Sequence, residues 1–286
     1  MSLSVEVGVE ALRHALAPLK SSGLRVGFVP TMGALHAGHA SLIRRARAEC
    51  RAVVVSIFVN PTQFDRPDDL ERYPRTFDAD LALCRSLGVD MVFSPTTAGM
   101  YPSSGGCSID PGPVAESCCG RYRPGHFRGV ATVVAKLLNI VQPDVGYFGE
   151  KDAQQLALVR RLVADLNMPV TIVGVPTVRE PDGLAVSSRN AQLDAAGRRL
   201  APALYGALSE AAASVAGGLS DPRAIARVAA ARIPSDDAVR LEYVEVVEPD
   251  YFQPVDPVSG PVVIAGVMWV GRTRLIDNVH CCPAGM

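Results

Sequence analysis

Short continuous runs of apolar residues alternate with helix-like segments along the first 176 residues. Runs rich in valine, isoleucine and phenylalanine cover residues 24–30, 52–59, 89–93, 145–148 and 170–175. Helical periodicity covers residues 1–19, 39–50, 77–87, 130–140 and 152–166. Continuous apolar strands between helices are typical of a parallel sheet covered on both faces. Because crossovers between parallel strands are right-handed, the pattern predicts an α/β fold with a Rossmann-like, doubly wound parallel sheet.

The pattern changes after residue 176. An alanine-rich helical stretch covers 191–216, and a second covers 221–232. We expect the first stretch to break near Pro202, because proline disrupts a helix interior. Strand-like runs follow at 241–247, 262–270 and 273–279. The sequence therefore predicts two domains, a Rossmann-like domain over 1–176 and a smaller α+β domain over 177–286.

Composition and charge exclude several classes of protein. The 28 basic and 29 acidic residues give a net charge of −1, which argues against nucleic acid or an anionic membrane as the main partner. The apolar run 262–270 is too short to cross a bilayer, and Glu6, Glu10 and His14 are unlike a signal peptide. Seven cysteines without a C-x-x-C spacing suggest neither a disulfide framework nor a zinc site. We expect a soluble cytoplasmic protein.

Two histidines, His36 and His39, follow the first strand of the predicted sheet and open a helix. Residues three apart share a helical face, and a helix N-terminus offers backbone N–H groups to a phosphate. Gly33 and Gly38 would let a phosphate approach the backbone closely. Capping of the helix or lining of a polar pocket is the alternative role. Metal ligation is less favoured, because no third ligand stands at a matching spacing.

Further polar residues stand where ligands bind in doubly wound sheets, at the carboxyl ends of strands. Lys151, one of only three lysines, follows the strand-like run 145–148, although a surface lysine is the usual alternative. The segment 185–190 supplies two serines and an arginine that can bind phosphate oxygens, although alone it would be a surface turn. Asn60 and Gln63 follow a strand as neutral amides suited to hydroxyl and carboxylate groups. Residues 121–128 form a cationic stretch, either a solvated loop or a lid over the phosphates.

These motifs resemble those of one family. An H-x-G-H motif after the first strand resembles the nucleotidylyltransferase superfamily, and within it the chain resembles the pantothenate synthetase (pantoate–β-alanine ligase) family over nearly its whole length. Five motifs occur in the family's order, at residues 30–39, 58–64, 125–132, 147–155 and 182–190.

The resemblance implies roles for individual residues. His36, His39, Lys151 and Arg189 would be catalytic, with His39 as the proton donor to the leaving phosphate. Gln63, Gln155 and Asn60 would bind the substrates pantoate and β-alanine. The implied contacts with ATP are Pro30, Met32, Gly33, Ala34, Leu35, His36, Ala37, Gly38, His39, Gly149, Glu150, Lys151, Asp152, Val178, Val186, Ser187, Ser188 and Arg189.

The implied reaction is the ATP-dependent condensation of pantoate with β-alanine to pantothenate. It would pass through a pantoyl adenylate and release pyrophosphate and AMP, with Mg²⁺, whose ligands we do not assign, neutralising the triphosphate. The resemblance also implies a homodimer, and a C-terminal domain that closes over the nucleotide site. Two alternatives stay open. A different nucleotidylyltransferase would keep the nucleotide on its product, and a binding module would hold ATP without turnover.

Overall fold

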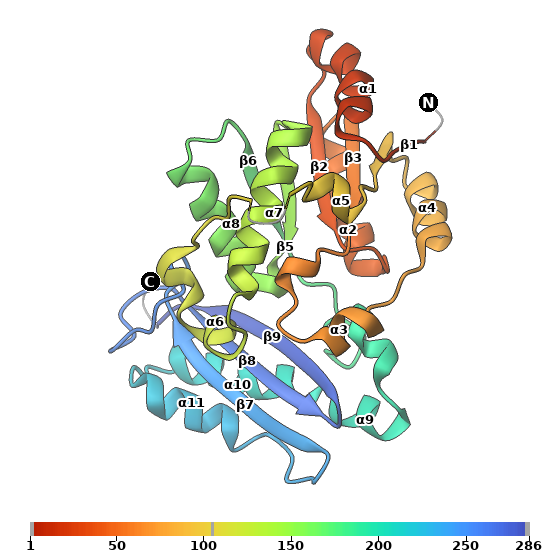
Figure 1. Cartoon of the computed structure of the whole chain (residues 1–286). Helices are drawn as coiled ribbons and strands as arrows, with labels where there is room; N and C mark the ends of the chain where they lie inside the picture. Colours follow the sequence, from red (N-terminus) through yellow and green to blue (C-terminus); the bar gives the residue numbers. More distant parts are fainter. Residues whose placement is uncertain (1–2, 104–105, 284–286) are drawn as a thin grey trace. The chain divides into compact units, whose positions relative to one another are not determined.

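The computed structural model describes residues 3–103 and 106–283, which form two compact units (Figure 1). The first unit comprises Met1–Pro111, Arg123–Glu150 and Leu158–Pro176. The second comprises Gly112–Tyr122, Lys151–Ala157 and Thr177–Met286. The chain therefore passes between the units several times before residue 177.

The first unit is built on a six-stranded parallel sheet with the strand order β1-β4-β3-β2-β5-β6. This confirms the predicted doubly wound sheet. The strands are β1 (Ser4–Glu6), β2 (Val26–Thr31), β3 (Ala52–Ile57), β4 (Met91–Phe93), β5 (Val145–Gly149) and β6 (Thr171–Val175).

The prediction of a single helix over residues 1–19 was wrong at its start. Ser4–Glu6 pairs with β4 as an edge strand, and helix α1 (Val9–Ser21) begins only after the extended residue Gly8. Glycine is a poor helix former, so Gly8 separates the two elements, and the pairing with β4 fixes the short strand. Helical periodicity alone did not reveal this tertiary contact.

Helices cover both faces of the first sheet. Leu42, Ile43 and Ala46 of α2 (Ala37–Glu49) pack with Leu81 and Cys84 of α4 (Phe77–Ser86) in one apolar cluster. Val145 and Tyr147 belong to the same cluster, whereas the Cβ position of Gly146, between them, faces Leu138 of α7 (His126–Val141). Because successive residues of a strand face opposite sides, α7 covers the other face. The other elements of this unit are η1 (Pro61–Gln63), α3 (Pro67–Arg72), α5 (Thr97–Met100), η3 (Glu150–Asp152) and α8 (Ala153–Asp165), of which η3 and α8 extend into both units.

Strands β2 and β5 pair only at their amino ends. Their register covers Gly27 with Val145 and Phe28 with Gly146, whereas β2 pairs with β3 along six residues. The Thr31 carbonyl accepts a hydrogen bond from Phe58 on the β3 side, so the nitrogen of the preceding Pro30 faces β5. A proline there costs no ladder hydrogen bond. The strand order reverses between β2 and β5, which is where doubly wound sheets bind ligands.

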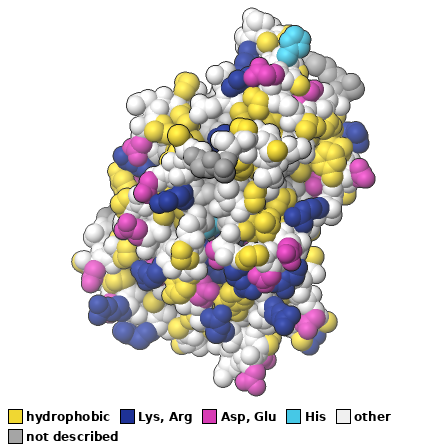
Figure 2. Space-filling view, in the orientation of Figure 1, with side chains coloured by type: hydrophobic (Ala, Val, Ile, Leu, Met, Phe, Trp, Pro, Cys, Tyr) yellow, Lys and Arg dark blue, Asp and Glu magenta, His cyan; other side chains and the backbone are white. Residues whose placement is uncertain are grey.

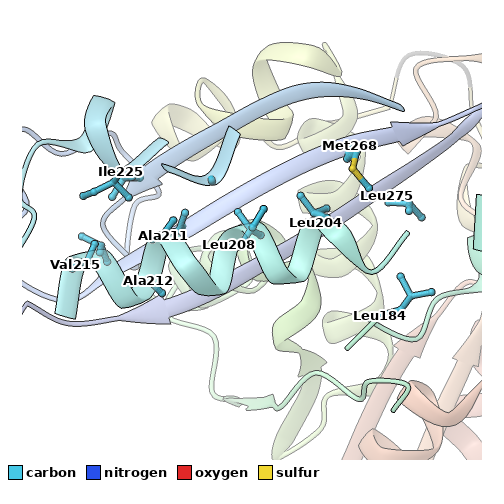
Figure 3. Packing of buried hydrophobic residues seen from close by; sticks show 14 of the residues in the cluster. Leu184, Leu204, Leu208, Ala211, Ala212, Val215, Ile225, Met268 and Leu275 are labelled. Atoms are coloured by element: carbon cyan, nitrogen blue, oxygen red, sulfur yellow. The ribbon is translucent and has the colours of Figure 1, made fainter. Parts of the chain in front are cut away.

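The second unit contains an antiparallel sheet of β7 (Val239–Val247), β8 (Val262–Val270) and β9 (Thr273–Cys281). Its helices are α6 (Cys118–Tyr122), α9 (Ala195–Leu200), α10 (Ala203–Ala216) and α11 (Pro222–Ala230), with short turns η2 (Gly112–Ala115) and η4 (Ser188–Gln192). The expected break falls at Pro202, and the small C-terminal α+β fold is confirmed. Figure 3 shows Leu204, Leu208 and Ala211 of α10 in the core with Met268 of β8.

The surface charges, the helices and the cysteines can be compared with what the composition indicated. Basic and acidic side chains are interspersed on the face shown in Figure 2. In the described ranges no helix combines the length and apolar character needed to cross a membrane. All seven cysteines are free thiols.

Candidate functional site

The two histidines lie side by side where β2 leads into α2. His36 is the N-cap of α2, and its Nδ1 accepts a hydrogen bond from the Gly38 backbone nitrogen at 3.1 Å. The Nδ1 of His39 accepts from the His36 backbone nitrogen at 3.3 Å, and the ring centroids are 4.1 Å apart. Because both Nδ1 atoms accept hydrogen bonds, a neutral ring carries its proton on Nε2. The capping contacts therefore use the Nδ1 atom of each ring and fix both rings at the start of α2.

Gly38 is required by the close approach of the His36 ring. A Cβ at this position would lie 2.9 Å from Cε1 and 3.0 Å from Nδ1 of His36. Any larger residue would push the ring out of its capping position. The glycine therefore sets where the histidine side chain lies.

A buried carboxylate that sequence reasoning missed holds the loop before the histidines. The Asp80 side chain, on α4, accepts hydrogen bonds from the backbone nitrogens of Ala34 at 3.0 Å and Leu35 at 2.8 Å. Thr76 donates to it at 3.1 Å, and Asp80 is only 2% exposed. The loop needs such support because Gly33 and Ala34 both have a positive φ, of 79° and 50°. The only signal in the sequence was an aspartate among the apolar positions of a helix.

A pocket of about 270 Å³ adjoins this loop at the carboxyl ends of β2, β3 and β4. Met32, Gly33 and Asp80 line one part of it, and Phe58 and Ser94 line another. The start of the loop that leads to the two histidines therefore borders a small pocket within the first unit.

Asn60 and Gln63 form one buried amide cluster after β3. The Asn60 Nδ2 donates to Gln63 Oε1 at 3.0 Å and to the Gly129 carbonyl at 3.3 Å. The Asn60 Oδ1 accepts from the Tyr101 hydroxyl at 2.8 Å and from the hydroxyl and the backbone nitrogen of Thr62. Asn60 is 1% exposed, so all its polar capacity is used within the protein. Its amide orients Gln63, whose Oε1 is an acceptor and whose Nε2 is therefore the group left to donate.

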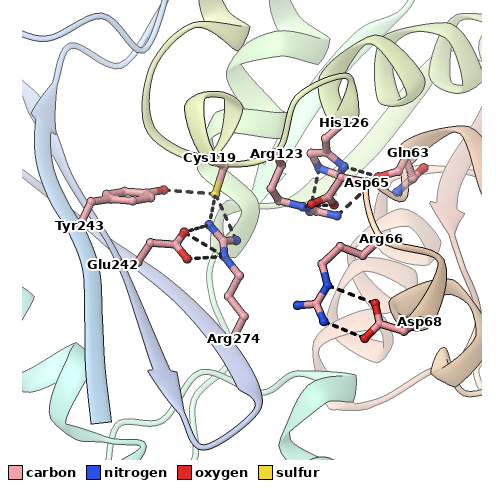
Figure 4. A network of polar contacts seen from close by, with 10 residues as sticks. All are labelled: Gln63, Asp65, Arg66, Asp68, Cys119, Arg123, His126, Glu242, Tyr243 and Arg274. Atoms are coloured by element: carbon pink, nitrogen blue, oxygen red, sulfur yellow. Dashed lines mark hydrogen bonds and ion pairs between the residues drawn. The ribbon is translucent and has the colours of Figure 1, made fainter.

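The start of α7 fixes the backbone that carries Gln63. A Cβ on Gly129 would lie 2.3 Å from the Thr62 carbonyl oxygen, so the helix and η1 meet backbone to backbone. His126 Nδ1 lies 2.7 Å from the Gln63 carbonyl oxygen, to which Arg123 also donates at 3.4 Å. Figure 4 shows both side chains converging on Gln63.

Arg123 also pairs with Asp65, at 2.9 Å. Burial alone would raise the pKa of Asp65, but the charge and hydrogen bond of Arg123 hold that pKa below its ordinary value of 3.8. Elsewhere in the predicted cationic stretch, Arg121 pairs with Glu245 at 3.1 Å and Arg128 with Asp110 at 3.9 Å. Of these three arginines, Arg123 has the most buried ion pair, whereas the Arg128 pair is long and exposed.

In the second unit, the turn η3 carries Lys151 directly after β5 along the chain. The Lys151 carbonyl accepts a hydrogen bond from Asn278 Nδ2 of β9 at 2.9 Å. Gln155 is half-buried, whereas the neighbouring Gln154 is buried and donates to the carbonyls of Val114 at 2.7 Å and Ser117 at 2.9 Å. Gln154 thus holds the 112–122 segment to α8, a structural role that the sequence did not indicate.

The segment with the two serines follows a short two-stranded bridge. Arg179 pairs with Ala185, and the Val186 nitrogen donates to the Val178 carbonyl at 2.9 Å. Ser187 then caps η4 by accepting from the Arg189 nitrogen at 3.3 Å. Ser188 and Arg189 follow within η4 and are half-buried. The bridge therefore fixes where this cationic segment begins.

The structure groups the expected residues by unit. The first unit holds the loop with Pro30, Met32 and the two histidines, together with the amides Asn60 and Gln63. The second holds Lys151, Asp152, Gln155, Val178 and the segment with Ser187, Ser188 and Arg189. Within residues 3–103 and 106–283, no three His, Cys, Asp or Glu side chains come together as a metal site.

Comparisons with known proteins agree on one family. The family model described as pantoate-beta-alanine ligase matches residues 5–280. Pantothenate synthetase 1 of Bradyrhizobium diazoefficiens is 50% identical over 278 residues, which cover 97% of this chain and 98% of the relative. The crystal structure of pantothenate synthetase from Thermus thermophilus is 44% identical, with a TM-score of 0.88 over 96% of this chain and 98% of that one.

A third comparison includes ligands. The crystal structure of a pantoate-beta-alanine ligase from Francisella tularensis, described as complexed with beta-gamma ATP and beta-alanine, is 34% identical. It has a TM-score of 0.80 and covers 97% of each chain.

Proposed function

The chain belongs to the pantoate–β-alanine ligase family, and from this premise we propose that it joins its substrates through a pantoyl-adenylate intermediate. The family activity is the ATP-dependent production of pantothenate. The observation that supports the adenylate route best is the pair His36 and His39 at the N-terminus of α2. Two imidazole donors beside a helix N-terminus form a site for a phosphate that gains charge as its bond breaks.

In the first step, a pantoate carboxylate oxygen attacks the α-phosphorus of ATP. An O–P bond forms, the bond to the β-phosphate oxygen breaks, and pyrophosphate leaves. We assign His39 as the donor to the leaving phosphate and His36 as a second donor beside it. Lys151 and Arg189 complete the charge stabilisation. Because the protein supplies charge and position, no covalent enzyme intermediate is needed.

In the second step, the β-alanine amine attacks the acyl carbon of the adenylate. A C–N bond forms, the C–O bond to AMP breaks, and the amine nitrogen loses a proton. A buried amide such as Gln63 suits these substrates, since it binds carboxylate and hydroxyl groups without adding a charge. We assign Gln63 and Gln155 to the pantoate and β-alanine contacts, and Asn60 to holding Gln63 in place.

The remaining nucleotide contacts stay proposals that rest on the family's motifs. They are Pro30, Met32, Gly33, Ala34, Leu35, Ala37, Gly38, Gly149, Glu150, Asp152, Val178, Val186, Ser187 and Ser188. We also propose that Mg²⁺ accompanies ATP and neutralises its phosphates. Mg²⁺ usually takes one or two carboxylates plus phosphate oxygens and water.

The test is a pyrophosphate-release assay on the purified chain. Pantoate and ATP should release pyrophosphate, and AMP should follow once β-alanine is added. We expect His39→Ala to slow pyrophosphate release by roughly 10²–10³-fold, as for loss of one transition-state donor. His14→Ala, at an exposed position of α1, is the matched control and should retain full activity.

Other outcomes would overturn the proposal. A stable adenylylated product that β-alanine leaves unchanged would favour a different nucleotidylyltransferase. ATP binding without turnover would favour a binding module. Pyrophosphate release at the normal rate from the His39→Ala variant would remove His39 from the assigned role.

We further propose a homodimer in the cytoplasm, on the family resemblance. Light scattering of the purified protein would check the first point, with a single species of about twice 30.2 kDa expected. Cell fractionation would check the second.

A further inference from the structure

We propose that two neighbouring residues of β9, Asp277 and Asn278, act together as positioning residues for the cationic groups of the second unit. Asn278 would fix the turn that carries Lys151, and Asp277 would fix the segment that leads to Arg189. The inference rests on the proposed function, because it gives these cations their role at the phosphates. It also gives a reason for the presence of two buried polar residues, Asp277 and Asn278, in the edge strand β9.

Strand alternation sends the two side chains to opposite faces of the sheet. On β9, Leu275 and Val279 pack in the cluster with α10, whereas Ile276 packs in the cluster with Ala153 of α8. Successive strand residues point to opposite faces. Asp277 therefore lies on the α10 face and Asn278 on the α8 face, where η3 carries Lys151.

The contact of Asn278 reaches the backbone of Lys151 itself. Its Nδ2 donates to the Lys151 carbonyl at 2.9 Å, and the residue is 7% exposed. The carbonyl belongs to the short turn η3 at the start of α8, and Ala153, two residues later, is buried in the apolar cluster on the same face of the sheet. This hydrogen bond therefore restrains the backbone from which the Lys151 side chain extends.

The contact of Asp277 reaches the other cationic segment. Its two carboxylate oxygens accept from Arg179 Nη1 at 2.7 Å and Nη2 at 2.9 Å, a bidentate pair. The Arg179 guanidinium also lies 3.7 Å from the ring centroid of Tyr205 and donates to the Gly183 carbonyl at 3.1 Å. Arg179 is thus held on three sides, and the bridge between Arg179 and Ala185 leads directly into Ser187.

The two contacts share a further link. Asp277 Oδ1 also accepts from the Asn278 backbone nitrogen at 2.8 Å, so the Asp277 carboxylate is held against the backbone of the residue that contacts Lys151. A rigid strand holds reactive groups more accurately than loops do, and a misplacement of about 1 Å can cost on the order of 10²-fold in rate. One strand would therefore set the spacing between Lys151 and Arg189.

A double-mutant cycle tests whether Asn278 positions Lys151. Asn278→Asp removes the donor at nearly constant size, and we expect a loss of at least 10-fold in kcat of pyrophosphate release, with the KM for pantoate within twofold. In a Lys151→Ala background the same change should have almost no further effect, because the residue it positions is gone. Asn278→Ala provides a second variant if the aspartate impairs folding.

A second double-mutant cycle tests whether Asp277 positions Arg189. Asp277→Asn should lower kcat at least 10-fold alone and have almost no further effect in an Arg189→Ala background. Glu242→Gln is the matched control, because it breaks another ion pair to β9, with Arg274 at 3.0 Å (Figure 4). The hydrogen bonds and the ion pair of the Glu242 side chain go to Trp269 and Arg274, away from residues 151 and 178–189. We expect its thermal stability to fall while kcat stays within twofold of the wild type.

The outcomes separate this proposal from the proposed function. Equal fold losses in the wild-type and the Lys151→Ala or Arg189→Ala backgrounds would show a general structural role and overturn the positioning role. A similar loss of kcat in Glu242→Gln would do the same. A wild-type chain that releases no pyrophosphate with pantoate and ATP would instead refute the proposed function.

Discussion

The Asp80 carboxylate oxygen lies 2.8 Å from the backbone nitrogen of Leu35, forty-five residues earlier in the chain. Its second oxygen accepts from Ala34 at 3.0 Å. A helix on one face of the sheet thus clamps the loop that delivers His36 and His39. Charge-assisted hydrogen bonds to backbone N–H groups are among the stronger ones in proteins.

We predict that Asp80→Asn damages both stability and the first chemical step. An amide at this position turns one acceptor into a donor that faces an N–H group, so one of the two backbone N–H groups, that of Ala34 or of Leu35, loses its acceptor. The free energy of unfolding should fall by about 1–3 kcal/mol, as for a buried group left unsatisfied. The rate of pyrophosphate release should fall by about 10-fold or more, because the histidines lose their fixed position.

Asp78→Asn is the matched control, since Asp78 lies on the same helix but is exposed. Urea unfolding and the pyrophosphate assay measure both variants. Wild-type activity in the Asp80→Asn variant would show that the loop keeps its shape without the clamp.

Gly38→Ala should displace the His36 ring. The new Cβ would lie 2.9 Å from Cε1 of His36, so the ring must rotate away from its capping hydrogen bond. We expect pyrophosphate release to fall at least 10-fold while the fold survives, because loss of an N-cap costs only about 0.5–2 kcal/mol.

Gly206→Ala makes the same chemical change within α10, where nothing lies within 4 Å of the new Cβ. It should stabilise the chain by up to about 1 kcal/mol and leave the rate unchanged. Equal activity of the two variants in the pyrophosphate assay would contradict the ring displacement.

The sequence predicted the elements whose packing follows from apolar periodicity. The parallel strands, the break at Pro202 and the small antiparallel sheet all appear where runs and periods indicated them. The predicted helix over residues 1–19 was wrong at Ser4–Glu6, because an edge strand of three residues depends on its partner β4 rather than on its own pattern. Motifs located the histidine loop and the serine segment, since glycine and histidine spacing is local information.

The residues that hold those motifs were beyond a single sequence. Asp80 and Asn278 act on loops far from them along the chain, and the sequence around each does not show which loop it contacts. The sequence likewise did not indicate the contacts of the two other lysines, Lys20 and Lys136. Lys20 donates to the Val141 carbonyl at 2.7 Å near the end of α7, and Lys136 lies 5.7 Å from the ring centroid of Tyr101.

Asn60→Asp should weaken pantoate binding through Gln63. The change replaces the donor to Gln63 Oε1 by a second acceptor, so the Gln63 amide is repelled or flips. We expect the KM for pantoate to rise at least 10-fold, with the KM for ATP within twofold. Steady-state kinetics with each substrate varied in turn would show this split.

Asn167→Asp is the control, because it makes the same chemical change in the turn after α8. Its kinetic constants should match the wild type. Parallel rises in the KM for both substrates in the Asn60→Asp variant would indicate general unfolding of the site instead of a change at Gln63.

The Asp65–Arg123 ion pair should make stability depend on pH in acid. Because Arg123 depresses the folded-state pKa of Asp65, the pair stabilises the chain above the unfolded pKa of about 3.8, and this contribution is lost as pH falls through the lower folded value. At pH 7 Asp65→Asn should reduce the free energy of unfolding by about 1 kcal/mol, and the gap to the wild type should close below the folded pKa. Urea unfolding at pH 7 and in acid measures this free energy for the wild type and for Asp65→Asn.

Asp68→Asn, in an exposed pair with Arg66 at 2.7 Å, is the control and should show the smaller effect at pH 7. A gap between wild type and Asp65→Asn that stays constant into acid would show that packing, rather than charge, joins the segment after η1 to the segment before α7.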